Sequence, residues 1–537
     1  MHIHQSEHAS FIPSRLREST LPMLAVAFIS AALAARLCAA GSYGEAFAVA
    51  AAAIGAAFLV RVPISIEAVV IIWFATAPLV SFYVRIPTDR SIITYNRIVF
   101  AVLAVALSLK WMRITTAPAT REQAIKSPAF SGGAAMWCAS FAVSKFEIAW
   151  ALLAVLTLAS AMAYSDNVAY ATRMAIDTFA LPLLAFHVAR NHLDLRGRGN
   201  FLVFAAVALA LFLFATGAFE FATGTDLFAY KGSEIVREGE RRVNGPFASD
   251  SSYAIICLLL FLFLRAAPGL FRLRLDRGAR LVYLCALAGA ALGALLPMFR
   301  AVAIALAAGW MVLWLTERRG RLRAQPSRPL QSTRVRGHLA PARRIRLNSL
   351  IVVILIALAL VGFVAAMAPL LAGSRLADPR TAYGRLATWK SAAEIAVENP
   401  IFGVGLGNYP EYYDRVRHEE DEPIEEVLDT RASRDPHSNV LWIAAELGLP
   451  GIALYLAANV WLFLLGWRAL KRAARGPQRA AAGCFLALVA GYWIPGLTLA
   501  SGYYSDLNLC FFFLLGALSS PLFRQPHHPT PSVDFGD

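Results

Sequence analysis

Charged residues are scarce in this 537-residue chain, in which Asp, Glu, Lys and Arg together make up 16% of the sequence. Soluble globular proteins carry about 25%. The shortage of charge excludes an ordinary soluble protein and indicates a chain whose solvent is lipid.

Cysteine patterns that hold metals or disulfides are missing as well. The six cysteines lie within or beside apolar segments and show no CxxC or CxxH spacing, so buried small hydrophobic side chains are their expected role. The first apolar segment is not followed by a small-residue cleavage motif and a long soluble domain. We therefore expect no cleavable signal peptide.

Long apolar runs are what the chain has instead. Residues 200–218 and 348–371 each contain roughly 20 residues without a charge, the length that a helix needs to cross a hydrocarbon core of about 30 Å. Only a helix satisfies its own backbone over that distance in an open chain. We expect an all-α, polytopic membrane protein with about 12–14 transmembrane helices. Hydropathy predicts spans near 20–38, 44–60, 66–84, 95–111, 146–163, 168–188, 200–218, 250–268, 281–297, 301–316, 348–371, 438–466, 480–498 and 506–523.

The net charge of +15 is concentrated in a few loops. Between Glu317 and Arg346 the chain has ten arginines and one glutamate. With the N-terminus inside, all such segments fall on the cytoplasmic side, as the positive-inside rule requires. The others are 110–126, 187–198, 265–280 and 467–479. The basic charge is therefore a topology signal, and we expect a bacterial inner-membrane protein with both termini cytoplasmic and no nucleic-acid partner.

The same topology places two larger loops, 219–249 and 372–437, on the periplasmic side. Loops of this length are more often functional than connecting. The chain is thereby divided into five regions: N-terminal transmembrane helices (1–218), a central transmembrane region with the first periplasmic loop (219–371), a large, partly helical periplasmic loop (372–437), C-terminal transmembrane helices (438–523) and a disordered cytoplasmic tail (524–537).

Several arginines stand at the outer ends of predicted helices or in the first outer loop. They are Arg97, Arg173, Arg241, Arg242 and Arg300. An arginine at membrane depth is costly and normally faces a polar interior and a partner. Asp177 follows Arg173 at the spacing of a structural ion pair, and Arg97 has the alternative of snorkelling to the interface. If the guanidiniums converge, they form a site for phosphate or pyrophosphate.

The second outer loop combines a helical pattern with a glycine run. Residues 381–398 place Leu386, Trp389, Ala393 and Ile395–Val397 at near-helical spacing, which predicts an amphipathic helix on the membrane. The Gly403–Gly407 run has no strand before it and no lysine after it, so we expect backbone turns packed on the helices rather than a nucleotide loop. The acidic stretch 418–429 is expected to be a solvated segment; shielding of the site and cation binding are alternatives, although it lacks EF-hand spacing.

His437 stands where the span 438–466 is expected to begin. An imidazole titrates near neutral pH and can serve as a general base, while a capping or interfacial role is the structural alternative. Arg431, Arg434 and Asp435 surround it with charge at the membrane surface, which favours a functional site.

Several of these residues also form a known pattern. His437-Ser438, nine residues and then Gly448-Leu449-Pro450-Gly451 resemble the H-[NSQ]-x9-G-x-x-G signature of the O-antigen ligase family. That superfamily includes Wzy-type polymerases and bacterial O-linked oligosaccharyltransferases. Further stretches similar to the family are Arg242–Phe247, Phe299-Arg300, Gly384-Arg385 to Trp389, and Asn399–Gly405. The resemblance covers about 242–455.

The resemblance implies a GT-C-like helical fold and a metal-independent, inverting glycosyltransferase without a cofactor. Its donor is expected to be a glycan linked to undecaprenyl pyrophosphate at the outer face of the membrane, and its acceptor lipid A–core or a growing glycan. His437 is expected to deprotonate the acceptor hydroxyl and Arg300 to hold the pyrophosphate. The expected supporting ligands of the pyrophosphate or glycan are Arg242, Arg385, Arg173 and Arg434.

Two other interpretations remain open at this point. The acidic stretch 418–429 has no place in the family pattern, and it is consistent with a distinct acceptor or with a polymerase rather than a ligase. A secondary transporter is the alternative from another class; it predicts inverted repeats and ionisable groups near the middle of the bilayer. We find no convincing repeat, and the unusual charges lie at helix ends.

Overall fold

The structure is a computed structural model, and it describes most of the predicted spans. The described residues are 66–83, 85–86, 93–115, 143–225, 227–228, 236–237, 240–241, 243–247, 249–271, 273, 275–322, 380–416, 435–473 and 476–520. The predicted spans 20–38, 44–60 and 348–371, the acidic stretch 418–429 and the expected tail 524–537 lie outside them.

The chain divides into two compact units, one of residues 1–69 and 79–117 and one of residues 70–78 and 118–537. Helix α3 (Ile66–Tyr83) contributes to both. In the first unit a short antiparallel hairpin, β1 (Arg85–Ile86) with β2 (Ile93–Thr94), leads into α4 (Tyr95–Thr115).

The larger unit is helical, with one further hairpin of β3 (Val236–Arg237) and β4 (Glu240–Arg241). Its helices are α7 (Lys145–Ala163), α8 (Val168–Ala175), α9 (Leu181–His192), α10 (Leu195–Thr223), α11 (Asp250–Phe271), α12 (Arg277–Leu295), α13 (Arg300–Leu322), α15 (Arg380–Glu398), α16 (Tyr409–Val416), α18 (Asn439–Arg472), α19 (Pro477–Gly496) and α20 (Ser505–Ser519). A π-helix, η2 (Ile176–Ala180), joins α8 to α9, and a 3-10 turn, η5 (Ser501–Tyr503), precedes α20.

Six described helices are long and apolar enough to cross a membrane, which confirms the all-α, polytopic prediction. They are Lys145–Ala163, Arg198–Thr223, Asp250–Phe271, Arg277–Leu295, Arg300–Arg318 and Asn439–Arg472. Large apolar side chains stand on their outer faces, such as Val155, Phe204 and Leu281, each more than 60% exposed. Exposed apolar surface of this kind requires a lipid environment.

Polar side chains fix the beginnings of the spans. Ser144 and Glu147 form a capping box at the start of α7: Ser144 Oγ accepts the N–H of Glu147 (3.2 Å), and Glu147 Oε2 accepts the N–H of Ser144 (2.7 Å). Asp276 caps α12 by accepting the N–H of Ala279 at 2.7 Å. Each cap satisfies backbone donors that the first turn leaves open.

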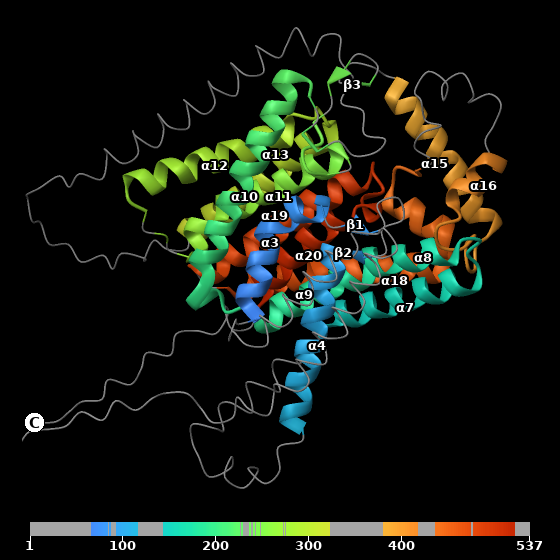
Figure 1. Ribbon diagram of the computed structural model, residues 1–537, viewed down its shortest axis with the longest axis horizontal. Coiled ribbons are helices and arrows are strands. Elements are labelled where there is room, and N and C mark those ends of the chain that lie inside the picture. Colours follow the sequence, from blue (N-terminus) through green and yellow to red (C-terminus); the bar gives the residue numbers. More distant parts are fainter. Residues whose placement is uncertain are drawn as a thin grey trace, which may run out of the picture. The chain divides into compact units, whose positions relative to one another are not determined.

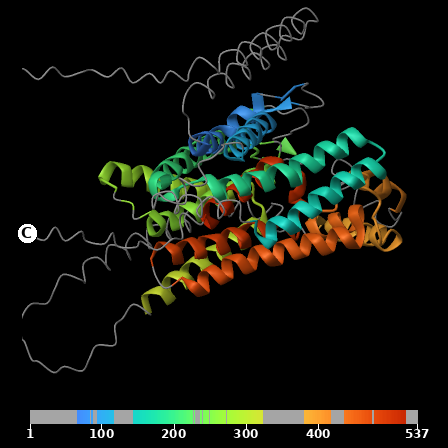
Figure 2. The ribbon, with the colours of Figure 1, turned by 90° about the horizontal axis from the view of Figure 1, so that it is seen from below.

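Helix α7 runs antiparallel to the long helix α18, and Figures 1 and 2 show the two side by side. The larger unit therefore has two ends. We call the end with Tyr164 and the start of α18 the His437 end, and the end with Ser144 and Arg472 the Glu147 end.

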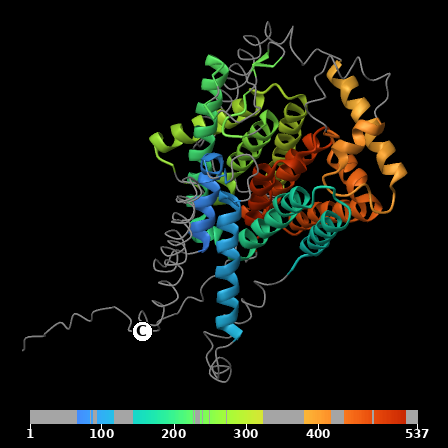
Figure 3. The ribbon, with the colours of Figure 1, turned by 45° about the vertical axis from the view of Figure 1, so that its right-hand side comes forward.

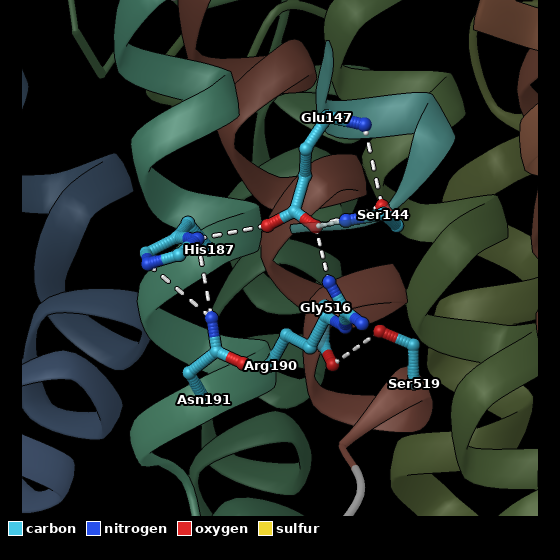
Figure 4. A network of polar contacts seen from close by, with 7 residues as sticks. All are labelled: Ser144, Glu147, His187, Arg190, Asn191, Gly516 and Ser519. Carbon is cyan, nitrogen blue, oxygen red and sulfur yellow. Dashed lines mark hydrogen bonds and ion pairs between the residues drawn. The ribbon is translucent and has the colours of Figure 1, made fainter. Parts of the chain in front are cut away.

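At the Glu147 end a buried carboxylate is neutralised by two neighbours. The Glu147 carboxylate pairs with Arg190 and lies 2.8 Å from Nδ1 of His187 on α9 (Figure 4). Close by in the bundle, Arg265 of α11 forms a two-pronged ion pair with Glu317 of α13 at 2.9 and 3.1 Å. These contacts hold the helices together at that end.

At the His437 end α15 and α16 pack against the first turns of α18 (Figure 3). Their shared core consists of Ala392, Ile395, Val404, Tyr409, Tyr413 and Ala445. The helix predicted at 381–398 is therefore confirmed as Arg380–Glu398. Leu386 and Val397 of its predicted apolar face are exposed, whereas Ala387, Thr388 and Ser391 are buried. Contact of the apolar face with the membrane stays a prediction.

Candidate functional site

His437 is presented by a tight turn ahead of α18. Asp435 Oδ1 accepts the backbone N–H of His437 at 2.8 Å, which is the hydrogen bond of an Asx turn. Pro436 between them has a fixed φ. His437 itself has φ 48°, in the left-handed region, which is costly for a residue with a side chain. The surrounding contacts therefore hold the histidine in one backbone conformation.

The pKa of the Asp435 carboxyl group in this turn is raised toward neutral pH. Burial raises the pKa of Asp435 to about 7, although the N–H of His437 and the guanidinium of Arg385 both act to lower it. Desolvation is the larger effect because it penalises the charged carboxylate. Asp435 thus changes charge in the pH range in which an imidazole acts as a base.

Helix α15 contributes two side chains to the site. The indole N–H of Trp389 donates to the backbone oxygen of His437 at 3.2 Å, so the backbone of His437 is fixed from both sides. One turn earlier, the guanidinium carbon of Arg385 lies 5.5 Å from the centre of the Phe299 ring, within the range of a cation–π contact. This contact joins the large loop to the start of α13.

The turn before α13 is the second strained point. Met298 has φ 55°. Among the described residues, Met298 and His437 are the two non-glycine residues with positive φ. Its N–H donates to Leu295 at 2.9 Å, and Phe299 then accepts from Val302 as the helix begins. Arg300 is the first residue of α13. Backbone strain of this kind concentrates at functional sites, and here both instances lie at the same site.

The loop between α19 and α20 completes the site. Asn439, the first residue of α18, donates to Ser501 Oγ (2.7 Å) and accepts the N–H of Gly502 (3.1 Å). Thr178 of η2 donates to the Gly502 oxygen at 2.7 Å. The loop is therefore tied to two helices.

Two tyrosines of this loop, Tyr503 and Tyr504, are partly buried near acidic groups. Burial, together with nearby Glu446 and Asp435, raises the pKa of Tyr503 well above its usual value. Burial and Asp435 likewise raise the pKa of Tyr504, which Ser249 partly opposes. Both phenols stay protonated at neutral pH. The Tyr503 hydroxyl is buried and has no hydrogen-bond partner among the described residues.

The glycine run meets a break in α18. Gly448 has φ 63° and ψ −158°, which interrupts the helix. The interruption frees two backbone oxygens: Ala445 O accepts from Val404 (2.9 Å) and Glu446 O from Gly405 (3.0 Å), while Leu449 donates to Pro400 (2.8 Å). The predicted backbone turns packed against a membrane helix are thereby confirmed.

Only glycine fits at the two closest points of this contact. A Cβ on Gly403 would lie 2.3 Å from the backbone carbon of Glu446, and one on Gly448 would lie 2.6 Å from the Ile401 oxygen. The buried Glu446 carboxylate adds a further link, because it accepts the indole N–H of Trp442 (2.7 Å) and the N–H of Tyr409 (3.3 Å). The break therefore anchors the large loop at the helix that begins with the histidine turn.

Two of the predicted site residues meet at Asp435, and a third follows their neighbour in the chain. Asp435 accepts from the backbone of His437 and lies near the guanidinium of Arg385. Arg385 also contacts Phe299, the residue before Arg300. Arg173 lies on α8, where its Nε–H donates to the Ala169 oxygen at 3.1 Å, and its part in the site stays a prediction.

Other predictions cannot be compared with the structure. Arg242, Arg431 and Arg434 lie outside the described residues, and of Arg241 only the backbone is described. Within the described part of the chain, no group of three or more His, Cys, Asp or Glu side chains is arranged to share a metal ion.

Sequence reasoning missed several residues of the site. Trp389 was expected on an apolar face rather than as a donor to the histidine, and Tyr503 and Tyr504 were not singled out. A polar SGYYSD run between two apolar segments was the available signal. For Glu446 the signal was a lone carboxylate inside a predicted span.

Part of the chain matches a known protein family. Residues 285–456 match the family model described as O-Antigen ligase (Wzy_C). The match includes Arg300, Arg385, Trp389, His437 and the Gly448 break. No curated protein matches the chain.

Proposed function

We propose that this multi-pass membrane protein, whose residues 285–456 match the O-Antigen ligase (Wzy_C) family model, transfers a glycan from undecaprenyl pyrophosphate to an acceptor hydroxyl. The match to this family model supports a role in membrane polysaccharide biosynthesis. The proposal has four further parts. The donor is lipid-linked, the enzyme is a ligase rather than a polymerase, the mechanism is metal-independent and inverting, and the site is periplasmic.

One observation carries the proposal. The two positive-φ, non-glycine residues of the described chain, Met298 and His437, flank a cluster in which Arg385 connects both. The cluster lies where the candidate spans Arg300–Arg318 and Asn439–Arg472 begin. A head group at the membrane surface is therefore within reach of this site, while its lipid tail remains in the bilayer.

The residues present suit the departure of pyrophosphate. The guanidiniums of Arg300 and Arg385 can hold a pyrophosphate through paired N–H donors, which also stabilise the negative charge that develops as the sugar–oxygen bond breaks. His437 takes the proton of the acceptor hydroxyl as that oxygen attacks the anomeric carbon. Direct attack on an α-linked donor inverts the anomeric centre. Arg242, Arg173 and Arg434 remain supporting candidates.

Asp435 and Tyr503 have supporting roles in this proposal. A charged Asp435 stabilises positive charge on the neighbouring histidine, and its hydrogen bond fixes the backbone from which the imidazole projects. The buried hydroxyl of Tyr503 offers a donor to a sugar or phosphate oxygen. A buried donor without a partner costs folding free energy, which binding of substrate would recover.

The test compares His437→Ala and Arg300→Ala with Arg318→Ala in a strain that lacks the chromosomal copy. Arg318 lies at the opposite end of the same span as Arg300, with its guanidinium 5.0 Å from the Trp314 ring, and is the matched control. The first two variants are expected to abolish glycan transfer at unchanged membrane levels, whereas Arg318→Ala keeps it. Full activity of either site variant contradicts its proposed role.

Electrophoresis of the surface glycan in the deletion strain separates the alternatives. Loss of long chains from lipid A–core, with polymer retained on the carrier lipid, supports a ligase. Products with a single repeat indicate a polymerase. An unchanged glycan profile contradicts glycan transfer and favours the transporter.

A further inference from the structure

A basic cavity lies at the Glu147 end, far along α18 from the histidine. It has a volume of about 410 Å³ and lies between α7, α18 and α19. Its polar wall includes Lys145, Arg468, Arg472 and Gln478, and its apolar wall includes Phe146 and Trp461.

Two cations of the cavity meet at one aromatic ring. The Lys145 ammonium lies 4.5 Å and the Arg468 guanidinium carbon 5.5 Å from the centre of the Trp461 ring. Each contact is favourable by itself, but the two like charges repel each other. Arg472, one turn beyond Arg468, adds a third positive charge to the lining. The arrangement favours an anion that lies between them.

Among the described residues that line the cavity, none has an acidic side chain that could take that place. Glu147, two residues after Lys145, is occupied by other groups: Figure 4 shows its carboxylate held by Arg190, His187 and Ser144. Its charge is thus already balanced within the α7–α9 contact.

The position of the cavity identifies the kind of anion. Lys145 begins one candidate span and Arg472 ends another, so the cations lie at the depth of lipid head groups. Apart from Ser144, the rest of the lining is apolar, with Leu465, Ala481 and Ala482 among it, and suits acyl chains. Nearby, Phe463 and Trp467 are partly exposed on α18, as expected for a surface that contacts lipid.

We propose that this cavity binds an anionic phospholipid, with its head-group phosphate between Lys145, Arg468 and Arg472 and its acyl chains along the apolar wall. Basic pockets between transmembrane helices recognise anionic head groups in this way. In the orientation that the positive-inside rule gives, the lipid belongs to the cytoplasmic leaflet. No residue of the glycan-transfer site takes part, so this proposal does not depend on the proposed function.

The experiment titrates phosphatidylglycerol into the full-length protein in an uncharged detergent and follows the thermal unfolding temperature. Phosphatidylglycerol is expected to raise that temperature with saturation, whereas phosphatidylcholine and inorganic phosphate leave it unchanged. The double variant K145Q/R468Q is expected to weaken the apparent affinity at least tenfold. Both side chains are exposed, so the variant is expected to fold.

A matched control comes from the same helix. The Lys471 ammonium lies 5.2 Å from the Trp467 ring, and this residue is outside the cavity lining. K471Q is therefore expected to change the affinity less than twofold. Native mass spectrometry supplies a second measurement: the wild type and K471Q retain phosphatidylglycerol, and K145Q/R468Q loses it.

Three outcomes would overturn the proposal. Equal weakening by K471Q and K145Q/R468Q indicates a general basic surface instead of a site. An equal shift with inorganic phosphate alone indicates a site for the free anion. An equal shift with phosphatidylcholine indicates that the cavity does not select charge.

Discussion

The contact between the glycine run and the broken helix allows a controlled test of what holds the histidine turn in place. Gly448 and Gly476 have nearly the same backbone conformation, φ 63°, ψ −158° and φ 69°, ψ −147°. A Cβ on Gly448 would lie 2.6 Å from one backbone oxygen, whereas a Cβ on Gly476 would meet nothing within 4 Å. Alanine at either position therefore has the same conformational cost, about 1–3 kcal/mol. Any difference in destabilisation between the two substitutions comes from the steric contact at Gly448.

That difference can be calculated from the hydrogen bonds. Gly448→Ala displaces residues 400–405 and breaks three backbone hydrogen bonds, from Val404, Gly405 and Leu449. Each contributes about 1 kcal/mol. Gly448→Ala is therefore expected to lower the free energy of unfolding by about 3 kcal/mol more than Gly476→Ala does.

The assay is unfolding of the purified protein by titration with sodium dodecyl sulfate, combined with hydrogen exchange of residues 400–409. Faster exchange of these amides is expected in Gly448→Ala alone. Glycan transfer should fall in the same variant, because the displaced loop and His437 share α18. Equal destabilisation by the two substitutions would show that the loop contributes nothing to the broken helix and would refute the reasoning.

Three further substitutions test the site. The folded-state pKa of Asp435 is raised to about 7, above its unfolded value near 4, so its contribution to the free energy of unfolding is lost as pH rises from about 4 to about 7. In Asp435→Asn, the plot of unfolding free energy against pH should lack this decline. Identical plots for the wild type and the variant contradict the burial of Asp435. Trp389→Phe removes one hydrogen bond to His437. Loss of about 1 kcal/mol should lower the turnover number about fivefold, with little change in KM. A change in KM alone contradicts a positioning role. Tyr503→Phe removes a buried hydroxyl that has no hydrogen-bond partner among the described residues, so glycan transfer should fall while the unfolding temperature stays equal or rises. A fall in unfolding temperature indicates a purely structural role.

The helices were predictable because hydropathy and run length act locally. The spans near 146–163, 200–218, 250–268 and 281–297 correspond to observed helices within a few residues. Breaks inside spans were not predicted. The π-helix Ile176–Ala180 divides one span and Gly448 another, although Pro450 was a signal for the second, since proline cannot continue a hydrogen-bonded helix.

The candidate site was predictable in its residue types and not in its contacts. Arginine at an unfavoured helix end marked Arg300, and a charged neighbourhood marked His437. The contact of Arg385 with Phe299 joins residues 86 positions apart, and no local pattern specifies such a pair. The positive φ of His437 is held by the local turn with Asp435 and by a hydrogen bond from Trp389, which is 48 positions away. The GT-C-like arrangement stays a prediction.

The break at Gly448 also has a consequence for biogenesis. A helix that enters the bilayer with unsatisfied carbonyl groups carries a penalty of several kcal/mol for each, and Ala445 and Glu446 find their donors in Val404 and Gly405. Those donors precede the break in the chain by about 40 residues and leave the ribosome first. The backbone donors that α18 needs at its break are therefore already synthesised when this helix enters the bilayer.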